Sequence, residues 1–288
     1  MKKKWIRIVL KIMGFGLLIL ILVISFLLYR FTKPISDQAI IEKFEDSPIQ
    51  PVIDSFYYKD KKVRIIKMQK EIDNDLPTIV FVHGSPGSSM DFKKYLQNTE
   101  LNKKANLITY DRIGYGNTSI GKVLNSIEQE VEVLHLLVED LDHEKVILVG
   151  YSYGGTVIMA DPDKYKKKIA LAAAVRGDLE PMFWLLNIYK WCTTRPLVPK
   201  ILQAASSEKY RHLTELQDIE DQWNLSESKV LSIHGTSDRI VPFQNSLFLK
   251  KIMDKEKFEL LPIEEGNHAL VWNQFDLINN EILKSLSN

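Results

Sequence analysis

The chain has 288 residues, 45% of them hydrophobic and 26% charged, which is typical of a globular protein and excludes a disordered or low-complexity chain. Its one cysteine, Cys192, excludes an intrachain disulfide, and its cysteine and histidine residues have no zinc-like spacing, so we expect neither a metal nor a cofactor. Residues 31–288 keep 32 of the 38 basic residues and all 37 acidic ones, and this net charge of about −5 argues against a nucleic-acid partner.

The first thirty residues differ from the rest of the chain. Five basic residues between Lys2 and Lys11 precede an uncharged run from Ile12 to Tyr29. Eighteen helical residues span about 27 Å, close to the roughly 30 Å hydrocarbon core of a bilayer. Because the run ends without a small-residue cleavage site, residues 1–30 are predicted to be an uncleaved transmembrane anchor, with a cleaved signal peptide as the alternative. The basic excess before the run places the N-terminus in the cytoplasm and the remaining domain outside.

Residues 31–50 are polar and contain prolines, and they are predicted to form a flexible linker. Apolar or alternating runs then predict strands over residues 52–58, 62–68, 78–82, 106–110, 145–149, 168–175, 229–233 and 258–261. Ser126, with Gln129 at the capping-box position, predicts the start of a helix, and residues 275–286 predict a closing amphipathic helix. This alternation predicts an α/β fold whose mostly parallel sheet is covered by helices on both faces. In such sheets the active site lies at the carboxyl ends of the strands.

The sequence Gly150-Tyr151-Ser152-Tyr153-Gly154 stands between the predicted strand 145–149 and a run that can continue as a helix. Gly-x-Ser-x-Gly in this strand-to-helix context is typical of a sharp turn that presents the serine hydroxyl at the edge of a sheet. Ser152 is therefore a candidate nucleophile, while a glycine-bracketed turn with a capping serine is the simpler alternative. The helix that follows is predicted to be short, about two turns, because an Asp-Pro-Asp sequence cuts it at residue 161.

Residues 177–225 carry helical patterns and no predicted strand. We therefore assign the α/β core to residues 51–176 and 226–288, with a helical cap between them. Within the cap, residues 182–191 are apolar almost all round. This run is either a helix packed onto the core or a lid whose inner face lines an apolar acyl pocket.

Four motifs in sequence order give the chain a resemblance to the α/β-hydrolase superfamily over roughly residues 50–288. They are His83-Gly84-Ser85-Pro86-Gly87, Gly150-Tyr151-Ser152-Tyr153-Gly154, the run His234-Gly235-Thr236-Ser237-Asp238 with its continuation to Pro242, and Gly266-Asn267-His268. The resemblance implies the α/β-hydrolase fold, with a small helical cap inserted in it. It also implies that the serine, aspartate and histidine of these motifs work together.

The chemistry expected of such a group assigns a role to each residue. Ser152 would be the nucleophile, His268 would take its proton and return it to the leaving group, and Asp238 would hold the imidazole in the right tautomer. By resemblance, the backbone N–H groups of Ser85 and Tyr153 would form the oxyanion hole.

Several other residues compete for these roles. Asp111, at the end of a predicted strand, is the alternative acid, although it more simply ties down the glycine-containing loop that follows it. The remaining histidines and two arginines are expected to be structural or solvated. His83 and His234 would hydrogen-bond their loops, His135, His143 and His212 would be solvated, and Arg112 and Arg239 would form ion pairs.

The sequence thus predicts a membrane-anchored serine hydrolase that cleaves small-molecule or lipid-like esters through an acyl-enzyme intermediate. An iminopeptidase-like amidase is a second hypothesis, because the His83–Gly87 loop is close to that group's oxyanion loop. The run Asp111-Arg112-Ile113-Gly114 departs from that group's Asp-Gln-Arg-Gly pattern. A third hypothesis is a membrane-anchored binding module that retains a hydrolase fold without activity.

Overall fold

The computed structural model describes residues 2–117 and 119–287 of the chain and contains an eight-stranded sheet. Its strands lie in the order β1-β2-β4-β3-β5-β6-β7-β8. β1 pairs antiparallel with β2, β2 pairs antiparallel with β4, and the remaining neighbours are parallel. The strands are β1 Val52–Tyr58, β2 Lys61–Lys67, β3 Thr78–Val82, β4 Asn106–Tyr110, β5 Val146–Tyr151, β6 Lys167–Leu171, β7 Val230–Gly235 and β8 Phe258–Ile263. This is the mostly parallel α/β sheet that the sequence predicted.

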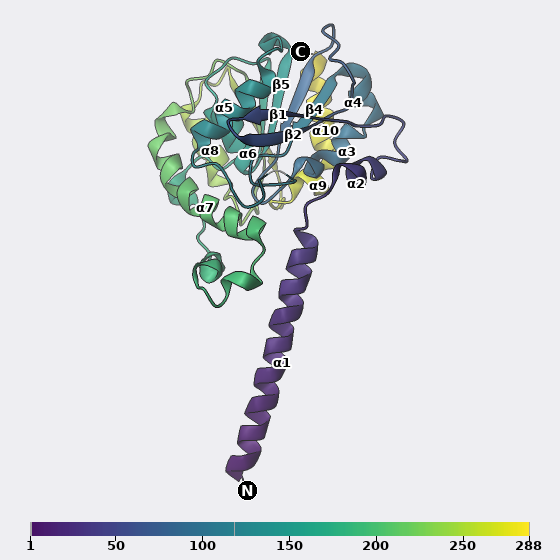
Figure 1. Ribbon diagram of the computed structural model, residues 1–288. Helices are drawn as coiled ribbons and strands as arrows, with labels where there is room; N and C mark the ends of the chain where they lie inside the picture. Colours follow the sequence, from purple (N-terminus) through teal and green to yellow (C-terminus); the bar gives the residue numbers. More distant parts are fainter. Residues whose placement is uncertain (1, 118, 288) are drawn as a thin grey trace.

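Helices cover both faces of the sheet (Figure 1). One face packs under α5 Ile127–Val138, α6 Tyr153–Ala160 and α8 Gln244–Ile252. The other packs under α3 Lys93–Leu96, α4 Thr99–Lys104, α9 Leu270–Asn273 and α10 Phe275–Ser287. The residues of β3, β4 and β5 are buried throughout, as expected of central strands with a helical layer on each side.

Two local predictions about helix and strand ends have different outcomes. Ser126 caps α5 by accepting a hydrogen bond from the N–H of Gln129, as the capping pattern predicted. The strand predicted to reach residue 175 instead ends at Leu171, so its end was wrong. Ala172 has a φ of 47°, and this left-handed residue turns the chain out of the sheet.

The prediction of a flexible linker over residues 31–50 is wrong. The segment contains the short helix α2 Asp37–Glu42, whose Ile40 is fully buried against the sheet. Arg64 of β2 donates to the carbonyl of Ile35 at 2.8 Å and pairs with the carboxylate of Asp37 at 2.8 Å. Phe44, just after α2, is also fully buried, so the segment is packed onto the α/β core.

The N-terminal helix α1 Lys2–Phe31 projects from the domain as one long rod (Figure 1). The most apolar 18-residue window of this helix has a mean hydropathy of 2.8, and almost all of its side chains are exposed. By length and composition this helix can cross a membrane. These two properties are shared by signal sequences near an N-terminus.

Residues 177–225, which we call the cap segment, are helical and contain no strand, and all of them are described by the structure. Its longest element is α7 Lys200–Asp218, preceded by 3₁₀ turns at Gly177–Leu179, Trp184–Lys190 and Arg195–Leu197 and followed by one at Glu220–Gln222. The buried residues of α7 recur every three or four positions, so one face of the helix packs onto the core. They are Ile201, Ala204, Ala205, Glu208, His212 and Leu216.

Candidate active site

Ser152 occupies a strained turn between β5 and α6. Its φ of 53° and ψ of −118° lie in a region that residues with a side chain rarely adopt. Strand and helix approach so closely that a Cβ on Gly150 would lie 2.3 Å from the carbonyl oxygen of Gly154. A Cβ on Gly154 would lie 2.1 Å from the carbonyl oxygen of Val82. Glycine is therefore required at both positions, because a side chain at either would collide with the neighbouring backbone. The Gly-x-Ser-x-Gly pattern predicted this close approach of strand and helix.

His268 and Asp238 lie beside Ser152. Nε2 of His268 is 3.1 Å from Oγ of Ser152, and Nδ1 of His268 is 2.7 Å from Oδ2 of Asp238. His268 follows β8, and its carbonyl accepts a hydrogen bond from the hydroxyl of Tyr151 at 2.9 Å. The structure thus brings together the three side chains that the motifs singled out, in the order serine, histidine, aspartate.

The environment of Asp238 keeps its carboxylate ionised. Burial opposes ionisation, but hydrogen bonds from His234, His268 and the N–H of Val241 outweigh it and lower the pKa of Asp238 below its usual range. A carboxylate whose ionised form is favoured in this way can stabilise a positive charge on His268.

The predicted oxyanion donors flank the serine. Tyr153 is the first residue of α6, where a backbone N–H has no partner within the helix. Gly84 is so close to Ser152 that a Cβ on it would lie 3.0 Å from the Cβ of Ser152. Ser85 therefore follows directly on a backbone segment that touches the serine, and Ser85, Ser152 and Tyr153 all line one cavity.

A buried network joins the Ser85 loop to the cap segment. Oγ of Ser85 is 2.7 Å from the hydroxyl of Tyr115, and that hydroxyl donates to Glu208 of α7 at 2.7 Å. Arg112 donates to Glu208 at 2.6 Å and to Glu130 of α5 at 2.8 Å, and all three side chains are buried. The network ties α7 to the loop that carries one predicted oxyanion donor.

Arg112 also contacts the two predicted oxyanion segments directly. Its guanidinium lies 4.0 Å from the ring centroid of Tyr153 and donates to the carbonyl of Gly84 at 3.3 Å. The sequence predicted an ion-pair role for Arg112, which the structure confirms. The sequence did not indicate that one partner comes from the cap segment.

The rival residues have structural contacts, and one of them, His234, also lies 3.4 Å from the carboxylate of Asp238. Asp111 pairs with Arg64 at 2.6 Å and accepts the N–H of Ser89 at 2.9 Å. His83 accepts the N–H of Arg112 at 2.9 Å through Nε2, and burial, with the nearby charge of Arg112, lowers the pKa of His83 to about 3. Nε2 of His234 lies 2.9 Å from the carbonyl oxygen of Val241. Both motif histidines hydrogen-bond their loops, as expected.

The expectation that His212 is solvated is wrong. Its side chain is buried in the cap segment, and its ring packs against Tyr153 at a tilt of 37°, with ring centroids 4.6 Å apart. Burial lowers the pKa of His212 well below its ordinary value, so the ring is neutral. It lies on the buried face of α7, four residues after Glu208, and the helical spacing of that face is the signal that could have found both residues.

A cavity of about 410 Å³ opens beside Ser152, and most of its lining is apolar. Phe183, Leu185, Leu186, Ile188 and Val198 contribute to it from the cap segment, and Leu28 contributes from α1. The lining of the cavity also contains the polar side chains of Lys209 and Glu180, which pair with each other, and of His212 beside them. Burial lowers the pKa of Lys209 to about 8.

The apolar run 182–191 does not pack onto the core as a regular helix. It forms a 3₁₀ turn at Trp184–Lys190, and Trp184 and Leu185 are 69% and 57% exposed. The interpretation as a helix buried on the core is therefore wrong. The lining contributed by Leu185, Leu186 and Ile188 agrees with the other interpretation, in which the run faces an apolar pocket.

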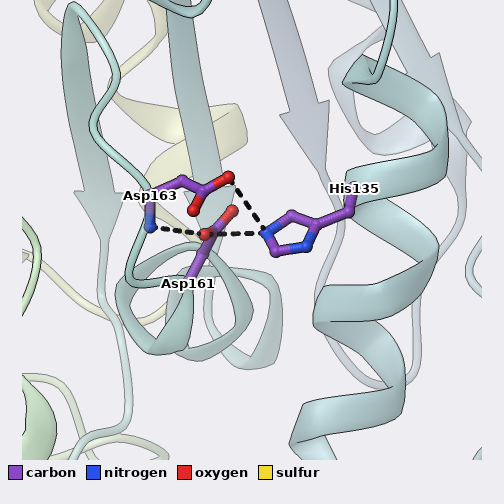
Figure 2. Close-up of side chains that lie close together, drawn as sticks. All are labelled: His135, Asp161 and Asp163. Carbon is purple, nitrogen blue, oxygen red and sulfur yellow. Dashed lines mark hydrogen bonds and ion pairs between the residues drawn. The ribbon is translucent and has the colours of Figure 1, made fainter.

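One cluster has the side chains of a metal site, contrary to the expectation that His135 is simply solvated. Possible ligand atoms of His135, Asp161 and Asp163 lie within 4.8 Å of one another, and Figure 2 shows the imidazole directed at both carboxylates. The carboxylate of Asp161 already has hydrogen-bond partners within the protein, because it also accepts from the hydroxyl of Tyr165 at 2.8 Å. The ammonium of Lys168, bonded to the carbonyl of Asp161, adds a positive charge. We interpret the cluster as an ion pair that joins α5 to the end of α6, away from Ser152.

Comparisons with known proteins agree with the fold. A family profile described as the alpha/beta hydrolase fold matches residues 77–198. A candidate non-heme chloroperoxidase of Synechocystis sp. is 22% identical over 252 residues, which cover 72% of this chain and 90% of that protein. A proline iminopeptidase of Lactobacillus helveticus is 34% identical over 85 residues, which cover 28% of this chain and 29% of that protein.

Solved structures share the same architecture. MGS-M2, an α/β-hydrolase enzyme from a Medee basin deep-sea metagenome library, superposes with a TM-score of 0.64 at 18% identity and covers 82% of this chain and 98% of its own. A membrane phospholipase A described as a bacterial virulence factor superposes with a TM-score of 0.60 at 11% identity and covers 100% of this chain and 98% of its own. The chain has the α/β-hydrolase fold, and this fold together with the hydrolase names among its relatives supports an enzyme.

Proposed function

We propose that the protein is a serine hydrolase that cleaves carboxylic esters through an acyl-enzyme intermediate. The observation that carries this proposal is the line of Ser152, His268 and Asp238, joined at 3.1 and 2.7 Å on the wall of an apolar cavity. A serine hydroxyl is a weak nucleophile without an adjacent base, and His268 is in reach to serve as that base.

In the acylation step, Oγ of Ser152 attacks the ester carbonyl carbon while its proton passes to Nε2 of His268. Asp238 holds the Nδ1–H of His268 and stabilises the imidazolium that forms. The backbone N–H groups of Ser85 and Tyr153 donate to the oxyanion. The tetrahedral intermediate then breaks the bond to the leaving oxygen, which takes the proton from His268 and departs as an alcohol.

Deacylation repeats these steps with water as the nucleophile. His268 accepts a proton from the water, the hydroxide attacks the acyl carbonyl, and Oγ of Ser152 leaves with the proton that His268 returns. The products are the free acid and the regenerated enzyme.

The cavity supports an ester with an apolar acyl chain, because apolar side chains from three parts of the fold line it. The likeness to a membrane phospholipase A is compatible with a lipid-like ester. The polar group of Glu180, Lys209 and His212 would lie beside the less apolar end of such a substrate.

An amidase of the iminopeptidase type is the second candidate, favoured by the local match to proline iminopeptidases. A substrate panel separates the two: p-nitrophenyl esters of increasing acyl length beside proline and alanine anilides, each with the wild type and Ser152→Ala. Turnover of esters alone, lost in Ser152→Ala, is the expected result. Anilide turnover that exceeds ester turnover would favour the amidase. If neither esters nor anilides show turnover that depends on Ser152, both enzyme hypotheses are contradicted. The third hypothesis, the membrane-anchored binding module, would then be favoured.

We further propose that α1 is an uncleaved anchor, with the N-terminus in the cytoplasm and the α/β domain outside. Support comes from the length and hydropathy of α1 and from the five basic residues that precede its uncharged run. The packed segment 31–50 would hold the domain close to the bilayer, because Arg64 fixes Ile35 and Asp37 only a few residues after α1 ends.

A further inference from the structure

The end of α1 nearest the domain is bound to the cap segment. Oγ of Ser25 donates to the carbonyl of Leu197 at 2.8 Å, and the hydroxyl of Tyr29 donates to the carbonyl of Pro196 at 3.1 Å. Leu28, between them, lines the cavity beside Ser152. Figure 1 shows this part of the cap segment, in green, reaching toward α1 away from the sheet.

These contacts fix the depth of the cap segment once α1 spans a bilayer. The uncharged run ends at Tyr29, and Ser25 lies four residues earlier, about 6 Å along the helix axis. Elements that lie in a membrane interface bury their apolar face about 5–10 Å into the boundary between headgroups and acyl chains. A chain segment that contacts α1 at Ser25 therefore lies at interfacial depth.

The side chains near this contact suit that position. Residues 182–197, which we call the rim, contain Lys190 and Arg195 and no acidic residue. Trp184 and Trp191 are 69% and 54% exposed to solvent in the isolated protein, although neither lines the cavity. Tryptophan prefers membrane interfaces, and basic residues are attracted to anionic lipid headgroups. Exposed indoles and positive charge thus coincide at the depth that α1 sets.

We infer that the rim inserts into the outer leaflet of the bilayer that α1 spans, and that the cavity takes its ester substrate from that leaflet. This inference rests on the proposed function, because it requires both the membrane-spanning α1 and the ester chemistry at Ser152. Since Leu28 and Leu185 line the cavity from α1 and from the rim, an acyl chain can pass from lipid to the cavity along apolar side chains. The substrate class is then an ester lipid resident in the membrane.

The position of the rim can be measured without activity. Full-length protein is reconstituted into phosphatidylcholine–phosphatidylglycerol vesicles that contain lipids with a doxyl quencher on the upper acyl chain. We expect the quenched fraction of tryptophan fluorescence to fall in Trp184→Gln/Trp191→Gln, because two inserted indoles are removed. Trp5, Trp223 and Trp272 remain in this variant, and the further change Trp5→Phe gives the share of quenching that belongs to Trp5 on the spanning helix. An unchanged quenched fraction with Trp5 still quenched would overturn the inference, and a Trp5 that is not quenched would overturn the anchor itself.

Activity provides the second measurement. In Trp184→Gln/Trp191→Gln we expect turnover of a long-chain ester lipid carried in the vesicles to fall about tenfold or more, because apolar contact with the leaflet is lost. Turnover of a short soluble p-nitrophenyl ester should stay at the wild-type value. Tyr57→Gln, which removes an equally exposed aromatic from β1, is the matched control and should change neither rate. Equal loss on both esters, or no loss on the lipid, contradicts uptake through the rim. Absence of soluble-ester turnover in the wild type would instead contradict the proposed chemistry.

Discussion

Asp238 accepts hydrogen bonds from Nδ1 of His268 at 2.7 Å and from the N–H groups of Ile240 and Val241 at 2.8 and 2.9 Å. The two backbone donors fix the carboxylate, and the carboxylate in turn fixes the imidazole. Asp238→Asn keeps the shape of the side chain but lets His268 adopt the other tautomer. We expect kcat on a soluble ester to fall by roughly 10²–10⁴-fold with the unfolding temperature little changed.

Asp111→Asn is the control for this substitution. The carboxylate of Asp111 is bonded to buried Arg64 and to the N–H of Ser89 rather than to His268. The change should therefore lower the free energy of unfolding by on the order of 3 kcal/mol while kcat of the folded protein stays near wild type. The assignment would be reversed by an inactive, folded Asp111→Asn beside a nearly normal Asp238→Asn. Steady-state kinetics and thermal unfolding of both variants give the answer.

At the scale of the elements, α7 reaches the predicted oxyanion loop through Glu208, Tyr115 and Ser85. In Glu208→Gln the buried Arg112 keeps Glu130 but loses one of its two carboxylates. We expect this variant to lose on the order of 1–3 kcal/mol of stability and about tenfold in kcat, because the loop that carries the N–H of Ser85 is held less firmly.

Glu215→Gln, on the same helix and only half-buried, is the matched control and should change kcat by less than about twofold. A kcat unchanged in Glu208→Gln, measured at a temperature at which the variant is folded, would show that the network stabilises the fold alone. Comparing kcat with KM separates the two effects, because a loosened oxyanion site lowers kcat while leaving KM largely unchanged.

The ion pair between α5 and the end of α6 predicts a pH dependence of stability. The hydrogen bond between His135 and Asp161 raises the pKa of His135 above its ordinary value of 6.5, although partial burial acts to lower it. A raised folded-state pKa contributes stability that is fully present below the unfolded pKa and is lost as pH rises through the folded one. The unfolding temperature of wild type should therefore exceed that of His135→Gln most at about pH 6 and least above the folded pKa. A difference that stays constant from about pH 6 to pH 9 would contradict this assignment.

On the scale of the whole molecule, the features that could be predicted from the sequence are the turns and strands that local patterns determine. The turn at Ser152 could be predicted because Gly150 and Gly154 are required by steric contacts within a few residues of the serine. The buried strands could be predicted because continuous apolar runs bounded by polar loops have few other structures available.

The parts that sequence reasoning missed depend on contacts between distant segments. His212 and Lys209 line the cavity, and Glu208 reaches Tyr115 beside the Ser85 loop, because α7 packs over the carboxyl ends of the strands, and no local motif marks these residues. Segment 31–50 looked like a linker because its composition is polar, although the apolar side chains of Ile40 and Phe44 are enough to pack it onto the sheet. Leu28 lines the cavity only because α1 lies against the cap segment.

The proposed membrane topology has its own test. Protease added to intact spheroplasts should digest the α/β domain, and the full-length protein should remain in the membrane pellet at high salt and alkaline pH. Both results follow from a helix that spans the bilayer with its basic end in the cytoplasm. Protection of the domain would reverse the orientation, and a soluble product that begins near residue 31 would mean a cleaved signal peptide.

The central claim is that Ser152 is the covalent nucleophile, and labelling with a fluorophosphonate tests it most directly. The probe reacts with a serine hydroxyl that an adjacent base activates, as His268 at 3.1 Å would activate Ser152. Detergent-solubilised full-length protein and its Ser152→Ala variant are treated side by side, and the modified peptide is identified by mass spectrometry. We predict one adduct in the wild type, on the peptide that contains Ser152, and none in the variant. Labelling that persists undiminished in Ser152→Ala, or ester turnover by a wild type that takes up no label, would contradict the claim.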